Sequence, residues 1–199
     1  MTTTDGTTDT PTQRRTRNAI LMAAAAVLSQ NPAASLGEIA DAAGVARSTL
    51  HRYFPERSDL IERLRAYSEE EIARAAREAR LDQGAAVDAL VRLCYEYFDR
   101  WNVITWLYLN TQRPEQDQCG VEDDLGPNLT DLIARGHDDG TIDPTLPNGW
   151  IQQMLWALLY SAWEYIHSGG ASRHETLDLT LSTLRRLVTP ASKAHEGGA

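Results

Sequence analysis

SLGEIADAAGVARSTLHRYFP, residues 35–55, is the stretch of sequence that decides the fold. Its first residue, Ser35, is followed three residues later by Glu38, which is the capping-box pattern at the start of a helix. Gly44 is expected to end that short helix, because glycine is favoured where helices terminate. A second short helix is predicted over about 46–53. The stretch therefore predicts two short helices joined by a tight turn.

Two short helices that cross at a steep angle restrict the residues between them. A small residue must stand where the helices touch, and Ala40 meets this need. The turn requires a residue that tolerates positive φ, and Gly44 supplies it. The apolar positions that would fix both helices to a third one are Leu36, Ile39, Ala43, Val45, Leu50 and Tyr53. This is the helix-turn-helix pattern, although the spacing alone also fits an ordinary helical hairpin with a solvated face.

The polar side chains of the second helix favour the helix-turn-helix. Its exposed face would carry Arg47, Ser48, His51 and Arg52, several of which can donate to phosphates or base edges. A helix predicted over 12–30 precedes the unit and begins with three arginines, Arg14, Arg15 and Arg17. A long helix predicted over 58–80 follows it. We therefore predict that this N-terminal region binds double-stranded DNA.

The sequence LGEIADAAGVARSTLHRYFP, with its surroundings from about 14 to 64, resembles the N-terminal domain of tetracycline-repressor-type (TetR) regulators. The Gly-Val pair, the Thr-Leu pair and the Tyr-Phe-Pro before a long helix carry the resemblance. It implies a homodimer on a palindromic operator, and a small-molecule effector in the C-terminal domain that changes the spacing of the two heads. Beyond residue 64 only the helical architecture is similar, so the resemblance does not identify the ligand.

The resemblance also implies roles for individual residues. Ser35 and Thr49 would touch phosphates or bases, and Arg47, Ser48 and Arg52 would face the major groove. The full set of predicted DNA-binding residues is Arg14, Arg17, Ser35, Arg47, Ser48, Thr49, His51, Arg52, Tyr53 and Arg57.

Two positions depart from the family pattern. Ala46 replaces the usual serine or threonine cap, so the second helix is expected to lack one hydrogen bond at its start. His51 stands where the family usually has a phosphate-bonding tyrosine, which puts that contact in doubt. Arg57 stands where a lysine is usual.

The whole chain is predicted to be all-α, with a three-helix DNA-binding domain followed by a helical ligand-binding and dimerisation domain. Apolar residues at helical spacing predict the later helices at 84–110, broken near Asn102, 121–136, 148–168 and 173–189. Ser58 is expected to cap the long helix. Loops are expected at 111–120 and 137–147. The predicted domains are a disordered tail at 1–10, the DNA-binding domain at 11–57, the effector and dimerisation domain at 58–189, and a disordered tail at 190–199.

Charge is unevenly distributed along the chain. The formal net charge is −9, of which residues 1–57 contribute +1 and residues 58–199 contribute −10. A neutral-to-basic head on an acidic body suits nucleic acid at one end only. The sequence shows no signal peptide and no membrane-spanning run, and its two cysteines do not make a disulfide framework. A cytoplasmic protein with no membrane partner is expected.

Aromatic residues gather in two segments of the C-terminal part, 95–108 and 150–165. At helical spacing such residues are more often core, but they also suit a cavity for a flat or cationic lipophilic molecule. The predicted ligand-binding residues are Tyr95, Phe98, Trp101, Trp106, Trp156, Tyr160, Trp163 and Glu164. The regulator is therefore expected to be a repressor that a small aromatic or lipophilic ligand releases from its operator.

The last two helices, 148–168 and 173–189, are predicted to form the homodimer as a four-helix bundle. The apolar faces assigned to this contact are Ile151, Leu155, Leu158, Ala162 and Ile166 on one helix and Leu177, Leu181, Leu184 and Val188 on the other. The alternative is that these faces pack only within their own domain.

Other classes of function are less well supported. The five histidines are scattered, and no metal site, cofactor or catalytic nucleophile–base pair is predicted. A helical enzyme with an aromatic cavity, or an adaptor that uses the same fold without DNA, are the alternatives to a regulator. Cys94 lies on an apolar helix and is expected to be a small buried hydrophobe, not a redox switch.

Overall fold

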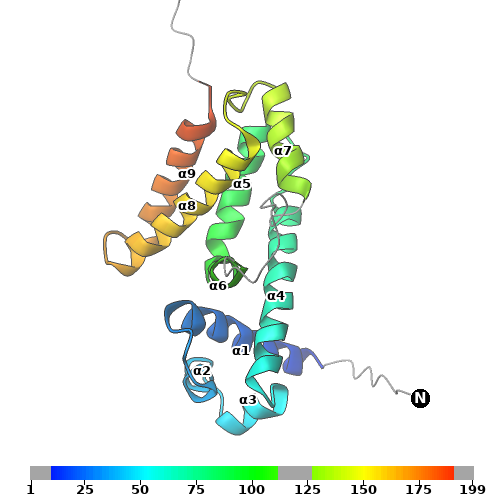
Figure 1. Ribbon diagram of the computed structural model, residues 1–199, viewed down its shortest axis with the longest axis vertical. Coiled ribbons are helices and arrows are strands. Elements are labelled where there is room, and N and C mark those ends of the chain that lie inside the picture. Colours follow the sequence, from blue (N-terminus) through cyan, green and yellow to red (C-terminus); the bar gives the residue numbers. More distant parts are fainter. Residues whose placement is uncertain (1–9, 112–126, 191–199) are drawn as a thin grey trace, which may run out of the picture. The chain divides into compact units, whose positions relative to one another are not determined.

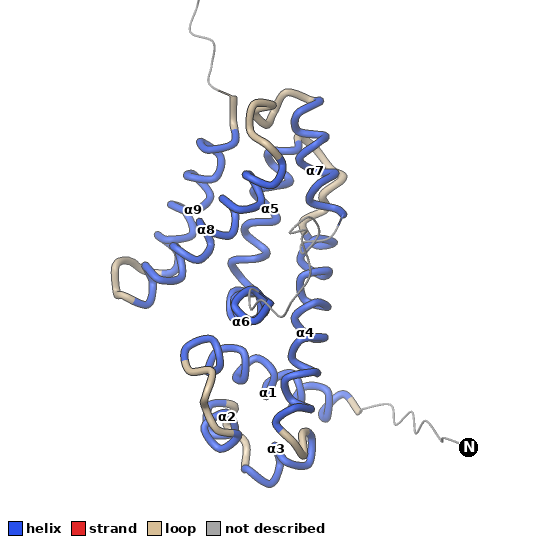
Figure 2. The backbone as a smooth tube through the Cα atoms, in the orientation of Figure 1, coloured by secondary structure: helices blue, strands red, loops and turns tan. Residues whose placement is uncertain are grey.

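The computed structural model describes residues 10–111 and 127–190, which form nine α-helices and no strand (Figures 1 and 2). The helices are α1 Pro11–Gln30, α2 Leu36–Ala42, α3 Arg47–Tyr53, α4 Arg57–Glu78, α5 Ala86–Asp99, α6 Trp101–Thr111, α7 Pro127–Asp138, α8 Asn148–His167 and α9 Arg173–Val188. The predicted all-α class is confirmed. The predicted tails, apart from Thr10 and Pro190, the loop at 112–120 and the start of the helix at 121–126 lie outside the described residues.

Within the described ranges, the chain folds into two compact units. The first holds residues 10–70 and 102–111, and the second holds residues 71–101 and 127–190. The division falls inside α4 and just after the first residue of α6. The domain boundary at 57/58 comes from sequence pattern alone and stays a prediction.

In the first unit, three local features set the order α1–α2–turn–α3. Ser35 starts α2 with the predicted capping box: its hydroxyl oxygen accepts from the Glu38 N–H at 3.2 Å, and its own N–H donates to the Glu38 carboxylate at 2.7 Å. Gly44 has φ +66°, as the turn requires. α3 begins after Ala46 without a side-chain cap, which confirms the predicted departure.

The first unit has an apolar core to which α1, α2, α3 and the first part of α4 contribute. Ala40 is fully buried, as expected for the small residue at the contact of the two short helices. The other fully buried side chains include Ile20, Leu21, Ile39, Leu50, Leu60 and Leu64. Burying this much apolar surface fixes the angle at which α3 is presented to solvent.

In the second unit, α5 packs against α7, α8 and α9, and α8 packs along α9 (Figure 1). α5 has no cap of its own, but Asp139, which follows α7, accepts from the Ala86 N–H at 3.2 Å. α8 and α9 are joined by a turn in which Gly169 has φ +75°. A side chain at Gly170 would collide with the Tyr165 ring.

Two details of the predicted helices need correction. α4 begins at Arg57, one residue early, and Asp59 caps it in place of Ser58 by accepting from the Glu56 N–H at 3.0 Å. The long predicted helix 84–110 is broken as expected, but at Arg100, between α5 and α6, and not at Asn102, which lies within α6. Among residues 10–111 and 127–190, no helix combines the length and apolar character that crossing a membrane needs.

The residues assigned to the dimer faces of α8 and α9 lie mainly in the core of their own unit. The fully buried ones are Ile151, Leu155, Leu184 and Val188, and Ala162 is nearly so. An amphipathic period marks the side of a helix that faces the core before it marks any interface. The choice of these five residues was therefore wrong. The other four, Leu158, Ile166, Leu177 and Leu181, are half-buried, and a dimer through these two helices stays a prediction.

Candidate nucleic-acid interface and aromatic clusters

α3 presents a polar face to solvent above a single buried anchor. Leu50 is fully buried, while Arg47, Ser48, His51 and Arg52 are exposed, as the sequence predicts. Thr49 and Tyr53 are half-buried at the edge of this face. The anchor fixes the helix, and the exposed side chains are left to contact a partner.

Tyr53 brings together two arginines that come from different helices. The guanidinium carbon of Arg17, on α1, lies 5.7 Å from the centre of the Tyr53 ring. That of Arg52, on α3, lies 5.5 Å from the same centre. Both distances are within the range of a cation–π contact. Arg14, also on α1, is exposed.

Arg47, at the start of α3, lies against α2. A Cβ placed on Gly37 would be 2.9 Å from the guanidinium carbon of Arg47, so the absence of a side chain at Gly37 makes room for this arginine. The close approach places the Arg47 guanidinium beside the start of α2. Sequence reasoning missed Gly37, because nothing local marks it.

Three predicted DNA-binding residues also make contacts within the head. Ser35 belongs to the capping box of α2. Nδ1 of His51 lies 3.4 Å from the Pro55 carbonyl oxygen. Arg57 donates to the carbonyl oxygens of Pro32, at 2.7 Å, and of Ala34, and so ties the start of α4 to the loop before α2.

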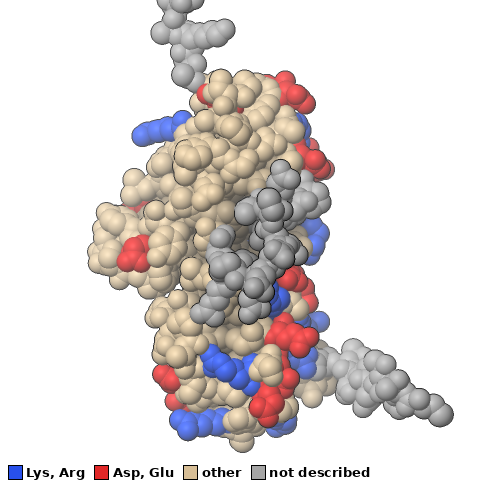
Figure 3. Space-filling model, in the orientation of Figure 1, with Lys and Arg blue, Asp and Glu red and all other residues tan. Residues whose placement is uncertain are grey.

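The head is mixed in charge and not uniformly basic. On the face shown in Figure 3, basic and acidic side chains both lie over the N-terminal helices. Arg17 of α1 and Arg52 of α3 both lie near the ring of Tyr53. The places where charged side chains gather on the N-terminal helices therefore describe this surface better than the net charge of +1 in residues 1–57 does.

Several aromatic residues of the second unit stack on one another. Tyr97 and Trp156 are parallel within 8°, with ring centres 5.8 Å apart. Trp163 stacks on Trp101 at 5.6 Å, and it also contacts Tyr160 at 5.9 Å and His167 at 4.3 Å. Tyr160 and Glu164 are exposed. Tyr97 and His167 were not among the predicted ligand-binding residues.

The predicted ligand-binding residues do not all come together. Tyr95 and Phe98 line a separate open pocket of about 280 Å³ with Asp99, Arg173, His174 and Leu177. Arg173 lies over the Phe98 ring at 5.4 Å and pairs with Asp99 at 3.1 Å. Trp106 is 1% exposed on α6, in the first unit.

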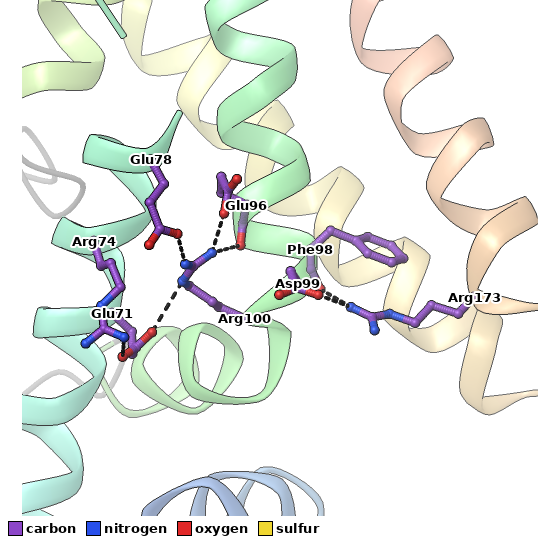
Figure 4. A network of polar contacts seen from close by, with 8 residues as sticks. All are labelled: Glu71, Arg74, Glu78, Glu96, Phe98, Asp99, Arg100 and Arg173. Atoms are coloured by element: carbon purple, nitrogen blue, oxygen red, sulfur yellow. Dashed lines mark hydrogen bonds and ion pairs between the residues drawn. The ribbon is translucent and has the colours of Figure 1, made fainter. Parts of the chain in front are cut away.

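A network of charged side chains surrounds Arg100, at the end of α5 (Figure 4). Its guanidinium points at Glu71 and Glu78 on α4 and back at Glu96 on α5, and the Glu71 pair measures 3.3 Å. Burial alone would lower the pKa of Arg100, but the hydrogen bond with Glu96 and the charge of Glu78 raise it above its usual value. The network joins α4 and α5 within the second unit.

The described residues contain no cluster of three or more histidine, cysteine or acidic side chains that would hold a metal ion. Cys94 is fully buried, as predicted, and burial raises the pKa of its thiol to about 12. A thiol with so high a pKa is a poor nucleophile at neutral pH. Cys119 lies outside the described residues.

Comparisons with known proteins agree with this geometry. The model of bacterial regulatory proteins of the tetR family matches residues 20–64. The transcriptional repressor LfrR of Mycolicibacterium smegmatis is 34% identical over 174 residues, which cover 86% of this chain and 89% of the relative. A crystal structure of LfrR from Mycobacterium smegmatis in complex with proflavine has a TM-score of 0.58 and 30% identity, and covers 89% of this chain and 99% of that one.

A TetR-family regulator from Marinobacter aquaeolei has the same fold, with a TM-score of 0.61 at 20% identity over 89% of this chain and 98% of that one. The match to LfrR extends through both predicted domains, whereas the family model covers the head alone. The regulator and the enzyme alternatives are thereby distinguished. This chain belongs to the TetR family of bacterial regulatory proteins, and it is a helix-turn-helix transcriptional regulator and not an enzyme.

Proposed function

We propose that the protein is a repressor that binds a palindromic operator as a homodimer and is released by a planar, cationic aromatic ligand. The observation that carries the DNA-binding part is the exposed polar face of α3 above the buried Leu50. The similarity to LfrR, a repressor, supports the sign of regulation. A regulator of this kind would act in the cytoplasm, on the chromosome.

The DNA contacts are assigned by position on α3. In helix-turn-helix proteins, the N-terminal residues of the recognition helix contact base edges. Arg47 and Ser48 begin α3 and would read bases, and Thr49 would contact the backbone or a base. The remaining proposed contacts, mainly to the backbone, are Arg14, Arg17, Ser35, His51, Arg52, Tyr53 and Arg57.

The proposed effector site is the stacked cluster of Trp101, Tyr160 and Trp163. Aromatic faces attract flat and cationic molecules, and the exposed Glu164 adds a carboxylate on the same helix. LfrR has been crystallised with proflavine, a compound of this class, which supports the choice.

The proposed dimer uses the outer surface of α8 and α9. Trp150 and Leu179 are 51% and 55% exposed, which is high for such large apolar side chains. Tyr165 and Leu179 line one surface hollow of about 650 Å³, which a second copy would fill. Leu179→Glu is then expected to give a folded monomer by light scattering and circular dichroism, whereas Leu184→Glu, in the core, should unfold. A wild type that is monomeric at micromolar concentration would exclude the dimer.

DNA binding is tested by a gel-shift screen over genomic fragments that include the region upstream of the protein's own gene. Arg47→Ala should weaken the specific complex by about 1–3 kcal/mol, which is about five- to 150-fold in affinity, if it contacts a base edge. Arg65→Ala, an exposed arginine on α4, is the matched control and should have little effect. A wild type that binds every fragment equally would contradict the proposal.

The effector is tested with proflavine as the probe. Titration into the free protein should quench tryptophan emission, and Trp163→Ala should weaken that binding more than Trp150→Ala does. Proflavine also binds DNA directly, so operator release must be compared between the wild type and Trp163→Ala at the same dye concentration. Equal release from both proteins would assign the effect to the DNA and exclude this site.

A further inference from the structure

The open pocket of about 280 Å³ in the second unit is formed by α5 and by the first two turns of α9. Its lining shares no residue with the stacked cluster of Trp101, Tyr160 and Trp163, which we propose as the effector site. It also shares none with the hollow assigned to the dimer. The proposed repressor function therefore leaves this pocket without an assigned ligand.

Two opposite charges stand side by side in the lining of this pocket. Nη2 of Arg173 donates to Oδ1 of Asp99 at 3.1 Å and to the carbonyl oxygen of Phe98 at 3.3 Å (Figure 4). Within residues 10–111 and 127–190, Nε and Nη1 of Arg173 and Oδ2 of Asp99 have no hydrogen-bond partner. The pair can therefore offer donors and an acceptor to a ligand while its own contact stays intact.

This arrangement of charges selects the polar part of a ligand. A ligand with a single charge would be attracted by one member of the pair and repelled by the other. A zwitterion whose ammonium and carboxylate groups are attached to one carbon atom can place each group beside the opposite charge. The guanidinium also suits a carboxylate, because its planar fork can donate two parallel hydrogen bonds. The α-amino acids are ligands of this kind.

The rest of the lining selects the apolar part. The face of the buried Phe98 ring is covered by Arg173, whose guanidinium carbon lies 5.4 Å from the ring centre. Tyr95 is exposed and Leu177 is half-buried, so both are left to contact a ligand. Aromatic rings pack well against such groups. A volume of about 280 Å³ is small for a ligand pocket and fits one ring better than a fused ring system.

We propose that this pocket binds a zwitterionic α-amino acid whose side chain carries a single aromatic ring. Its carboxylate would accept from Nε and Nη1 of Arg173, and its ammonium group would donate to Oδ2 of Asp99. Its ring would pack against Tyr95 and Leu177. This is a second ligand site, and it depends neither on the proposed DNA contacts nor on the proposed effector cluster.

The experiment uses L-phenylalanine as the probe, with the full-length protein at pH 7, and follows binding by saturation-transfer NMR. A Kd of about 1 mM is expected, because the ligand is small and the site is open. Neither 3-phenylpropionate, which lacks the ammonium group, nor 2-phenylethylamine, which lacks the carboxylate, can satisfy both charges. Each should bind about fivefold more weakly, which is the effect of one exposed ion pair. L-alanine, which lacks the ring, should not bind measurably.

Two variants exchange these preferences. Asp99→Asn should weaken L-phenylalanine about fivefold but not 3-phenylpropionate, so the preference between these two ligands should disappear. Arg173→Gln should in the same way remove the preference for L-phenylalanine over 2-phenylethylamine. The matched control is Arg185→Gln, which breaks the other exposed ion pair between α9 and α5, with Asp88, and should bind L-phenylalanine like the wild type. Thermal melts show which variants are folded.

Three results would overturn the proposal. The first is no binding of L-phenylalanine at about 10 mM, which is tenfold above the expected Kd. The second is equal loss of all three aromatic probes in Asp99→Asn and Arg173→Gln, because the pair would then only support the fold. The third is loss of L-phenylalanine binding in Trp163→Ala, which would place the ligand in the effector cluster; retained binding in that variant is the expected result.

Discussion

Arginine meets an aromatic ring in both units, but with different partners. In the second unit, Arg173 lies over Phe98 and also donates to the Asp99 carboxylate, so the guanidinium is shared by a ring and an anion of the same protein. In the first unit, two guanidinium groups share the single ring of Tyr53. The first arrangement joins a ring, a guanidinium group and a carboxylate of one unit, and the second brings guanidinium groups from α1 and α3 to one ring. The same pair of residue types can thus serve folding or binding.

The difference extends to the other arginines of the two units. In the second unit, Arg100 and Arg185 pair with carboxylates, and Arg92 donates to backbone carbonyl oxygens. In the head, Arg57 is held in the same internal way by two carbonyl oxygens. Counting arginines in a sequence therefore does not reveal how many are available to a polyanion.

The largest effect is expected when an internally paired arginine is removed. Arg100→Ala leaves the Glu71 carboxylate, whose side chain is only 8% exposed, with Arg74 as its one remaining ion-pair partner among the described residues. The free energy of unfolding should fall by about 3 kcal/mol, since a buried charge that loses a partner is costly. Urea denaturation followed by circular dichroism measures this. Arg185→Ala, which breaks a half-exposed pair, should cost at most about 1 kcal/mol; equal losses would contradict the distinction between the two pairs.

A smaller effect is expected at Arg57, the internal arginine of the head. Arg57→Ala removes two charge-assisted hydrogen bonds to the loop before α2, and water replaces them only in part. Stability should fall by about 1–2 kcal/mol. If Arg57 also contacts DNA, the folded variant will in addition bind more weakly; if stability is unchanged, the internal role assigned to Arg57 is wrong.

The sequence predicts those structural features that arise from residues close together in the chain. The capping box of Ser35 and Glu38, the positive φ of Gly44 and the missing cap at Ala46 follow from residues within a few positions, and all three are found. Five residues of the predicted dimer faces were misassigned because periodicity shows which side of a helix is apolar, and not what covers it.

Contacts between distant positions are not visible in a local pattern. Arg173 and Phe98 are 75 residues apart, and Arg57 and Ala34 are 23 apart. The aromatic-rich segments were correctly identified as special, but only the fold shows that Trp163 stacks on Trp101 while Tyr95 and Phe98 line a different pocket. The same holds for the contact between Arg17 of α1 and the ring of Tyr53 on α3.

Arg17 and Arg173 each lie near an aromatic ring, so a variant at either position can serve as the control for a variant at the other. Arg173→Ala should lower stability by less than about 1 kcal/mol, because the pair is exposed, and should leave DNA affinity unchanged. Arg17→Ala should do the opposite, weakening DNA binding with little effect on the melting temperature. Melting curves and salt-dependent DNA titrations on both variants decide this. If Arg173→Ala lost DNA affinity, the assignment of Arg173 to folding and of Arg17 to DNA binding would be wrong.

The smallest effect is expected from a carboxylate of the head that is used for capping and not for pairing with an arginine. The Ser35 N–H and hydroxyl hold the pKa of Glu38 below its usual range. A carboxyl whose pKa is lowered in the folded state stabilises the fold above its unfolded pKa of about 4.3, and this contribution is lost as pH falls through the lower, folded value. The melting temperature of the wild type should therefore exceed that of Glu38→Gln at pH 7, and the gap should close towards pH 3. Glu62→Gln, an exposed glutamate on α4, controls for the loss of one negative charge. A gap that stays constant across this range would mean that the stabilisation by Glu38 does not depend on the ionisation of its carboxylate.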